Sequence, residues 1–179
     1  MEVVEKKYRD TPKSSKKYAK RLTDYISFLM SKGRNLEAKH FFRILQEEKP
    51  THAETIRLGY SLSIATFDNE GVKVFDKLLY DSKPSEIEIC WFRLKYYLSV
   101  NDYQSCEETC VCLLSKRLEN DHLNTIYEAC IYLKSYVIAQ NLLKYLKKED
   151  LMFKDVGTRK IKKIIIQKLV DVLGVANLG

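Results

Sequence analysis

Three cysteines and one histidine in the second half of the chain are the clearest candidates for chemistry. Cys106, Cys110, Cys112 and His122 are residue types that bind zinc. Cys106 and Cys110 stand four residues apart and share one helix face, but Cys112 points about 200° away from Cys110. One helix therefore cannot direct all three thiols at one ion. We interpret these thiols as core side chains, and the sequence predicts no metal site.

Other catalytic patterns do not emerge from the sequence. The three histidines are scattered and adjoin no nucleophile motif, and the chain has no glycine-rich phosphate loop. Acidic pairs such as Glu47–Glu48 and Glu107–Glu108 are typical of solvated helix faces. We therefore expect a non-enzymatic protein with no catalytic residue and no cofactor.

Composition favours a helical protein with its thiols reduced. The 179 residues are 45% hydrophobic, enough for one domain with a sizeable core, and include only 6 Gly and 3 Pro. Five cysteines, an odd number, argue against a disulfide framework. No run of about 18 apolar residues is present, so we expect no membrane span. These features indicate a cytoplasmic or nuclear location.

The positive charge is concentrated at the two ends of the chain. Residues 1–21 hold eight Lys/Arg against three Asp/Glu, and residues 147–168 hold the same numbers, so each segment carries +5. Residues 22–146 carry 15 basic and 17 acidic residues, a net −2. Two interpretations remain open. The ends are either solvated terminal segments or contacts for nucleic acid or an acidic partner.

A motif recurs about every 34 residues. A small residue stands at Ala38, Gly71, Cys106 and Ala139, and a hydrophobic residue usually follows four positions later. Lys-Pro also recurs at 49–50 and 83–84, 34 residues apart. Self-similarity at this period is typical of stacked helical hairpins. The repeat therefore predicts an all-α architecture.

Hydrophobic periodicity and cap residues place eight helices in four antiparallel pairs. Gly33 is expected to end the first helix, Asn35 to cap the second, and Thr51 with Glu54 to form a capping box for the third. Ser82 or Ser85 is expected to open the fifth. The expected ranges are 14–32, 35–48, 51–67, 69–80, 82–100, 102–116, 120–134 and 135–147.

The two ends of the chain differ from the repeats. Residues 1–13 are predicted to be a basic, disordered segment ending near Pro12, and residues 14–150 to form the repeats. Residues 151–179 are predicted to contain an amphipathic basic helix over about 155–173. Its apolar stripe either caps the repeats or docks another chain.

The repeating units resemble tetratricopeptide repeats over about residues 19–150. The residues that carry the resemblance are Leu58-Gly59, Tyr96 or Tyr97, Ala38 with Phe42, Gly71 with Phe75, Cys106 and Ala139. The resemblance implies a right-handed α-solenoid of four hairpins, closed by the C-terminal helix. Glu88 stands where some members of that family carry a cation for a partner's carboxylates, so we do not expect binding to chaperone C-termini.

Two further resemblances define the alternatives. Lys32 to Phe42 followed by Lys49-Pro50 is similar to the pentatricopeptide repeat, which implies RNA binding, although its base-reading residues are not matched. Residues 97–105 and 127–133 resemble tetratricopeptide subunits of the anaphase-promoting complex. That second resemblance implies a homodimer.

We therefore expect a scaffold that binds a protein or peptide as a subunit of a larger assembly. In tetratricopeptide repeats the first helix of each hairpin lines the concave groove. On these helices we expect the partner to contact Arg57, Tyr60, Trp91, Lys95 and Tyr127. For Trp91 the alternative is core packing. The rival function is nucleic-acid binding through the basic termini.

Overall fold

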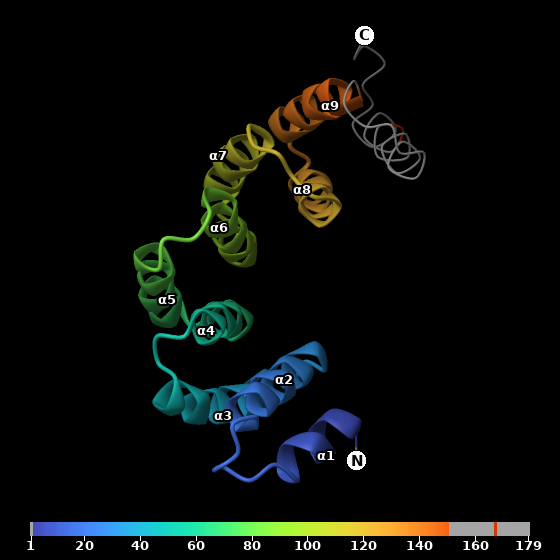
Figure 1. The fold of residues 1–179 in the computed structure, drawn as a ribbon. Coiled ribbons are helices and arrows are strands. Elements are labelled where there is room, and N and C mark those ends of the chain that lie inside the picture. The colour runs from blue at the N-terminus through green and yellow to red at the C-terminus, as the bar shows by residue number, and fades with distance from the viewer. Residues whose placement is uncertain (1, 151–166, 168–179) are drawn as a thin grey trace. The chain divides into compact units, whose positions relative to one another are not determined.

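A computed structural model describes residues 2–150 and residue 167 (Figure 1). The chain divides into two compact units, Met1–Phe92 and Arg93–Gly179, with the boundary inside α6. We call them unit 1 and unit 2. The described residues form nine α-helices: α1 (Val3–Arg9), α2 (Tyr18–Ser31), α3 (Asn35–Glu48), α4 (Ala53–Ala65), α5 (Asn69–Asp81), α6 (Glu86–Val100), α7 (Tyr103–Leu114), α8 (Asn120–Leu133) and α9 (Tyr136–Asp150).

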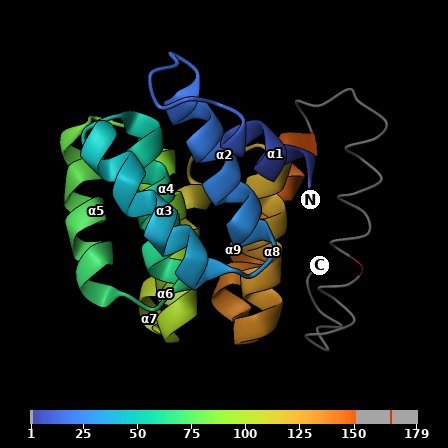
Figure 2. The same ribbon diagram turned by 90° about the horizontal axis from the view of Figure 1, so that it is seen from below.

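Unit 1 is built from sequential helix pairs. α2 packs on α3, and α4 packs on α5, while α3 and α2 also contact α4 (Figure 2). Apolar residues at helical spacing supply the core, for example Leu22, Ile26 and Leu29 on one face of α2. Gly59 allows the closest approach: a Cβ there would lie 2.3 Å from Phe75 Cζ and 2.6 Å from Phe42 Cζ.

Unit 2 repeats the same kind of packing with α7, α8 and α9. α9 contacts both α7 and α8. Side chains from all three helices fill its core, among them Cys106, Cys110, Leu113, Ile126, Ile138 and Leu142. The Tyr145 hydroxyl accepts a hydrogen bond from the Leu118 backbone N–H at 2.9 Å, which fixes the α7–α8 connector to α9.

One turn geometry joins the two helices of each of the four pairs. A left-handed residue follows the first helix, and the next N–H donates to the carbonyl five residues earlier, as in a Schellman motif. The left-handed residues are Gly33, Phe67, Asn101 and Lys134, at φ 71°, 53°, 56° and 51°. The hydrogen bonds are Arg34 N to Leu29 O, Asp68 N to Ser63 O, Asp102 N to Tyr97 O and Ser135 N to Cys130 O, at 2.9–3.1 Å. These turns therefore recur at spacings of 34, 34 and 33 residues, which matches the repeat in the sequence.

The predicted helices agree with α2 to α9 to within a few residues, and Gly33 has the predicted left-handed conformation. The Ser85 hydroxyl accepts a hydrogen bond from the Glu88 N–H at 3.2 Å, so Ser85 and not Ser82 opens α6. Two predicted caps are wrong. α4 begins after His52 without a side-chain cap, and Asn35 lies inside α3, where its amide donates to the Ala65 carbonyl at 3.3 Å.

The predicted disorder of residues 1–13 is also wrong, because this segment contains α1. Tyr8 holds α1 in place: its ring stacks on Tyr25 at 4.9 Å and meets Phe41 edge-on at 5.6 Å. The helix predicted over 155–173 and the capping role of segment 151–179 lie outside the described residues, apart from Gln167.

The predicted register of small residues needs one correction. Ala38, Cys106 and Ala139 are buried at the same position after their turns, but the equivalent residue of α5 is Val72. Gly71 lies one residue earlier, and a Cβ there would come within 2.5 Å of Ser63 Oγ. Gly71 therefore serves the contact between α5 and α4, and the buried position tolerates a valine.

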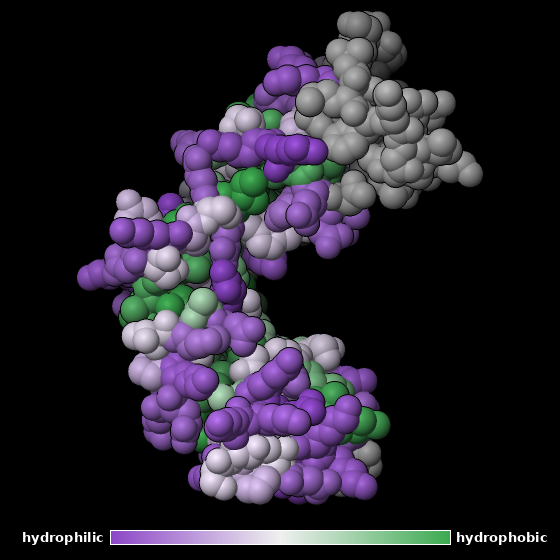
Figure 3. Space-filling model, in the orientation of Figure 1, coloured by the Kyte–Doolittle hydropathy of each residue, from purple (hydrophilic) through white to green (hydrophobic). Residues whose placement is uncertain are grey.

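Hydrophilic side chains cover most of the face drawn in Figure 3, with hydrophobic ones between them. None of the helices in the described part of the chain is long and apolar enough to cross a membrane.

Candidate functional site

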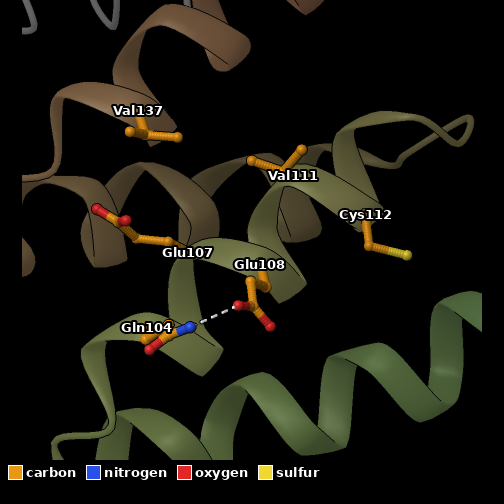
Figure 4. Close-up of a pocket in the computed structure, with 6 residues that line it drawn as sticks. All are labelled: Gln104, Glu107, Glu108, Val111, Cys112 and Val137. Carbon is orange, nitrogen blue, oxygen red and sulfur yellow. Dashed lines mark hydrogen bonds between the residues drawn. The ribbon is translucent and has the colours of Figure 1, made fainter.

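A shallow pocket of about 470 Å³ lies between α7 and α9 of unit 2 (Figure 4). We call it the α7/α9 pocket. It is lined by Gln104, Glu107, Glu108, Val111, Cys112 and Val137. Positions three and four apart on a helix share one face, so 104, 107, 108, 111 and 112 form a continuous strip on α7. Val137, in the first turn of α9, completes the pocket.

The apolar part of the pocket is exposed. Val111 and Val137 are 36% and 47% accessible, respectively. Tyr103 and Tyr136, the first residues of α7 and α9, are also exposed and precede pocket residues in the chain. Apolar side chains that gather beside a pocket are more informative than single exposed ones. This arrangement can cover an aliphatic or aromatic side chain of a partner.

The acidic part of the pocket contains one structural and one available carboxylate. Glu107 accepts a short hydrogen bond from the Ser135 hydroxyl, which itself accepts a bond from the Ile138 N–H at 3.1 Å. Glu107 therefore fixes α7 to the start of α9. Glu108 Oε1 accepts a bond from Gln104 Nε2 at 3.0 Å, and none of the lysine and arginine side chains that the structure describes forms an ion pair with Glu108.

An equivalent link exists in unit 1. Lys39, five residues after Arg34, forms a 2.7 Å ion pair with Asp68, just as Glu107, five residues after Asp102, bonds Ser135. The Lys39 ammonium and the Gly71 N–H together lower the pKa of Asp68. In both units, therefore, the residue five positions after the cap of one hairpin's second helix bonds to the cap residue of the next hairpin's second helix.

Of the three thiols that the sequence analysis assigned to the core, those of Cys106 and Cys110 are buried and that of Cys112 is not; Cys130 is buried as well. Burial raises the pKa of Cys106 to about 11, of Cys110 to about 12 and of Cys130 to about 11. Cys112 is half-buried and lines the α7/α9 pocket. Among the side chains that the structure describes, no group of three or more from His, Cys, Asp and Glu is placed to hold a metal ion.

The five residues predicted for the groove are divided between the two units. Arg57, Tyr60 and Trp91 belong to unit 1, whereas Lys95 and Tyr127 belong to unit 2. Trp91 and Tyr127 are half-buried, and Lys95 is exposed although desolvation of its ammonium lowers its pKa.

Arg57 is exposed, and its guanidinium makes two hydrogen bonds to the Glu88 carboxylate, the longer at 3.2 Å. These hydrogen bonds raise the pKa of Arg57. A partner that binds Arg57 must therefore compete with Glu88.

Tyr60 is the clear error among the five. It is 1% accessible, its ring lies 4.9 Å from that of Phe92, and its hydroxyl donates to Asp76 Oδ1 at 2.9 Å. The reason is geometric: α4 packs against α2, α3 and α5, so only a narrow strip containing Arg57 stays open. Tyr60 lies only about 60° from Arg57 around the helix, but this rotation takes it out of the open strip and onto Phe92 and Asp76.

The sequence analysis missed the α7/α9 pocket because it searched first helices, whereas the pocket uses second helices of neighbouring hairpins. The available signal was Val111, Val137 and the tyrosines at 103 and 136, apolar residues at positions that the helical pattern leaves outside the core. Comparison of the chain with known protein families, with curated proteins and with solved structures finds no match.

Proposed function

We propose that this protein is a non-enzymatic scaffold that binds a protein or peptide segment as a subunit of a larger assembly. Its architecture in this proposal is a right-handed tetratricopeptide-like solenoid of four hairpins with a C-terminal capping helix. Sequential helix pairs joined by one recurring turn support that architecture. A cytoplasmic or nuclear location and a homodimer remain parts of the proposal that rest on sequence.

The α7/α9 pocket is the observation that carries the function. Exposed Val111 and Val137 line the same pocket as Glu108, whose carboxylate has no cationic partner among the described side chains. A partner segment that places an aliphatic or aromatic side chain on the valines and a Lys or Arg near Glu108 satisfies both features. Anchors of this kind dominate binding energy at protein interfaces.

Selection from a displayed library of random 12-residue peptides tests this proposal. We expect enrichment of peptides that pair a basic residue with a large apolar one. Val137→Ser should remove the apolar contact, and Glu108→Lys should repel the basic residue. Each should weaken a selected peptide by about 30-fold, the equivalent of ~2 kcal/mol. The matched controls are Val74→Ser on α5 and Glu47→Lys on α3, both exposed.

Either of two results would contradict the proposal: failure to enrich any peptide, or peptides that bind the pocket variants and the wild type equally. Glu107 is left unchanged because its bond to Ser135 supports the fold.

The rival function, nucleic-acid binding through the basic termini, is retained because of one specific observation in unit 1. That observation concerns the lysines of the N-terminal end and not a base-reading repeat of the pentatricopeptide kind.

A further inference from the structure

Six lysines at the N-terminal end of unit 1 are exposed and lack acidic partners. We call them the N-terminal lysine surface: Lys6, Lys7, Lys13, Lys16, Lys17 and Lys20. Three nearby carboxylates are used elsewhere: Glu2 pairs with Lys32 at 3.7 Å, Glu5 with Arg9 at 2.7 Å and Asp24 with Arg21 at 3.6 Å. Asp10 is exposed within the segment and leaves its net charge strongly positive. Within residues 2–150, none of the six lysines forms an ion pair.

An aromatic cluster gives this surface a fixed support. Tyr8 of α1 lies between Tyr18, Tyr25 and Phe41, with ring centroids 5.9, 4.9 and 5.6 Å away. The Tyr8 and Tyr18 hydroxyls are 3.4 Å apart. α1 consequently packs against α2, as Figures 1 and 2 both show. Lys6 and Lys7 lie on α1 and Lys20 lies on α2, whereas Lys13, Lys16 and Lys17 lie in the turn-rich connector between these two helices. The connector is held at both ends by helices that pack on each other, so the lysines do not belong to a free tail.

We propose that the N-terminal lysine surface binds the phosphate backbone of a nucleic acid without reading its base sequence. Six like charges within fifteen residues repel one another and favour a polyanion, whose bound counterions are released on binding. Lysine ammonium groups contact phosphate as point charges and carry no base preference. This function goes beyond the scaffold role and uses a different surface in a different unit.

The same geometry argues against an anionic membrane as the partner. A helix that lies on a bilayer needs an apolar face to insert beside its lysines. The one aromatic ring of α1, on Tyr8, is engaged with the rings of α2 and α3. The large apolar side chain that α1 leaves exposed is Val3, at 68%, so the lysines adjoin a single valine and not the apolar face that membrane binding requires.

Fluorescence anisotropy with the full chain tests the proposal. The probes are a labelled 20-nucleotide oligo(U) RNA and a labelled 20-base-pair DNA duplex, titrated between 50 and 200 mM NaCl. Each phosphate contact contributes about −0.7 to the slope of log affinity against log salt for a single strand. Six contacts give a slope of about −4. The triple variant Lys13→Gln, Lys16→Gln, Lys17→Gln should reduce it to about −2.

A charge-matched variant separates this surface from net charge. Arg43→Gln, Lys49→Gln, Lys77→Gln removes three exposed positive charges elsewhere in unit 1 and should leave the slope and affinity nearly unchanged. The basic residues of 147–168 are present in both variants and contribute equally. Circular dichroism of both variants verifies that their helices are retained.

Three results would overturn the proposal: no binding to either probe at 50 mM NaCl, equal losses in the two triple variants, or binding only to vesicles containing phosphatidylserine. Equal losses would assign the binding to net charge, and vesicle binding would assign the lysines to a membrane. Peptide binding at the α7/α9 pocket should be unaffected by either triple variant.

Discussion

Replacement of Gly59 by alanine inserts one methyl group between two phenylalanine rings. The new Cβ would lie 2.3 Å from Phe75 Cζ and 2.6 Å from Phe42 Cζ, whereas relaxed carbon contacts are about 3.5–4.0 Å. Each ring must therefore retreat by roughly 1 Å. Both rings are buried and packed edge-on at 5.7 Å, so a shift of either ring disturbs the contact between them.

The sign of the effect distinguishes this packing from ordinary helix propensity. Alanine is favoured over glycine within a helix by about 1 kcal/mol. Overpacking typically costs about 1–3 kcal/mol, and two rings on different helices place this site in the upper part of that range. We expect Gly59→Ala to lower the free energy of unfolding by about 1–2 kcal/mol.

Urea unfolding followed by circular dichroism at 222 nm measures this change. Ser61→Ala, two residues further along α4, serves as the helix-propensity control and should be neutral or slightly stabilising. In a Phe75→Leu background the added methyl group should cost less, which gives a coupling of about 1 kcal/mol between the two sites. If Gly59→Ala instead stabilised the protein, the close approach of α3, α4 and α5 would be incorrect.

Three further predictions concern the turns, the caps and the thiols. Lys134→Gly should raise the free energy of unfolding by about 0.5–1 kcal/mol in urea titration, because glycine removes the left-handed strain at φ 51°; a decrease would refute the turn geometry. The Lys39 ammonium lowers the pKa of Asp68 in the folded protein, so the ionised carboxylate stabilises the fold above the usual pKa of aspartate. This stabilisation is lost as the pH falls through the lowered pKa of the folded state. The stability gap between wild type and Asp68→Asn should therefore shrink below about pH 4, and a gap that persists at pH 2 would contradict the assignment. Iodoacetamide at pH 8 should label the two half-buried cysteines faster than the buried Cys106, Cys110 and Cys130, as read by peptide mass spectrometry. Burial raises the pKa of these three thiols, so the free energy of unfolding should fall above about pH 9, where the thiols ionise in the unfolded chain but not in the folded one.

The helices could be predicted from the sequence because their signal is local. Leu22, Ile26 and Leu29 define one face within two turns of α2, and Gly33 marks its end within the same segment. α1 gives no such signal, since it has seven residues and none of them is fully buried. What orders it is the contact of Tyr8 with Tyr25 and Phe41, which are distant in sequence.

The candidate site could be predicted less well than the fold, because exposure depends on how many neighbours a helix has. Tyr60 is on a helix that three others surround, so a residue expected in a groove became part of the core. The α7/α9 pocket joins Val111 and Val137 across two hairpins. Periodicity along a single helix indicates which residues face outward, but not which outward faces of separate helices adjoin.

The recurring turn also determines how unit 1 would respond to tension. Its helices make their main contacts with helices one or two places along the chain, so a force applied to the ends passes through the hairpins in series. The left-handed residues Gly33 and Phe67 mark the same point in two successive hairpins and lie 34 residues apart, which is the length of one hairpin with its connector. Fully extended, it releases roughly 110–120 Å of contour length. Unit 1 would therefore lengthen in steps of about that size when its two ends are pulled apart.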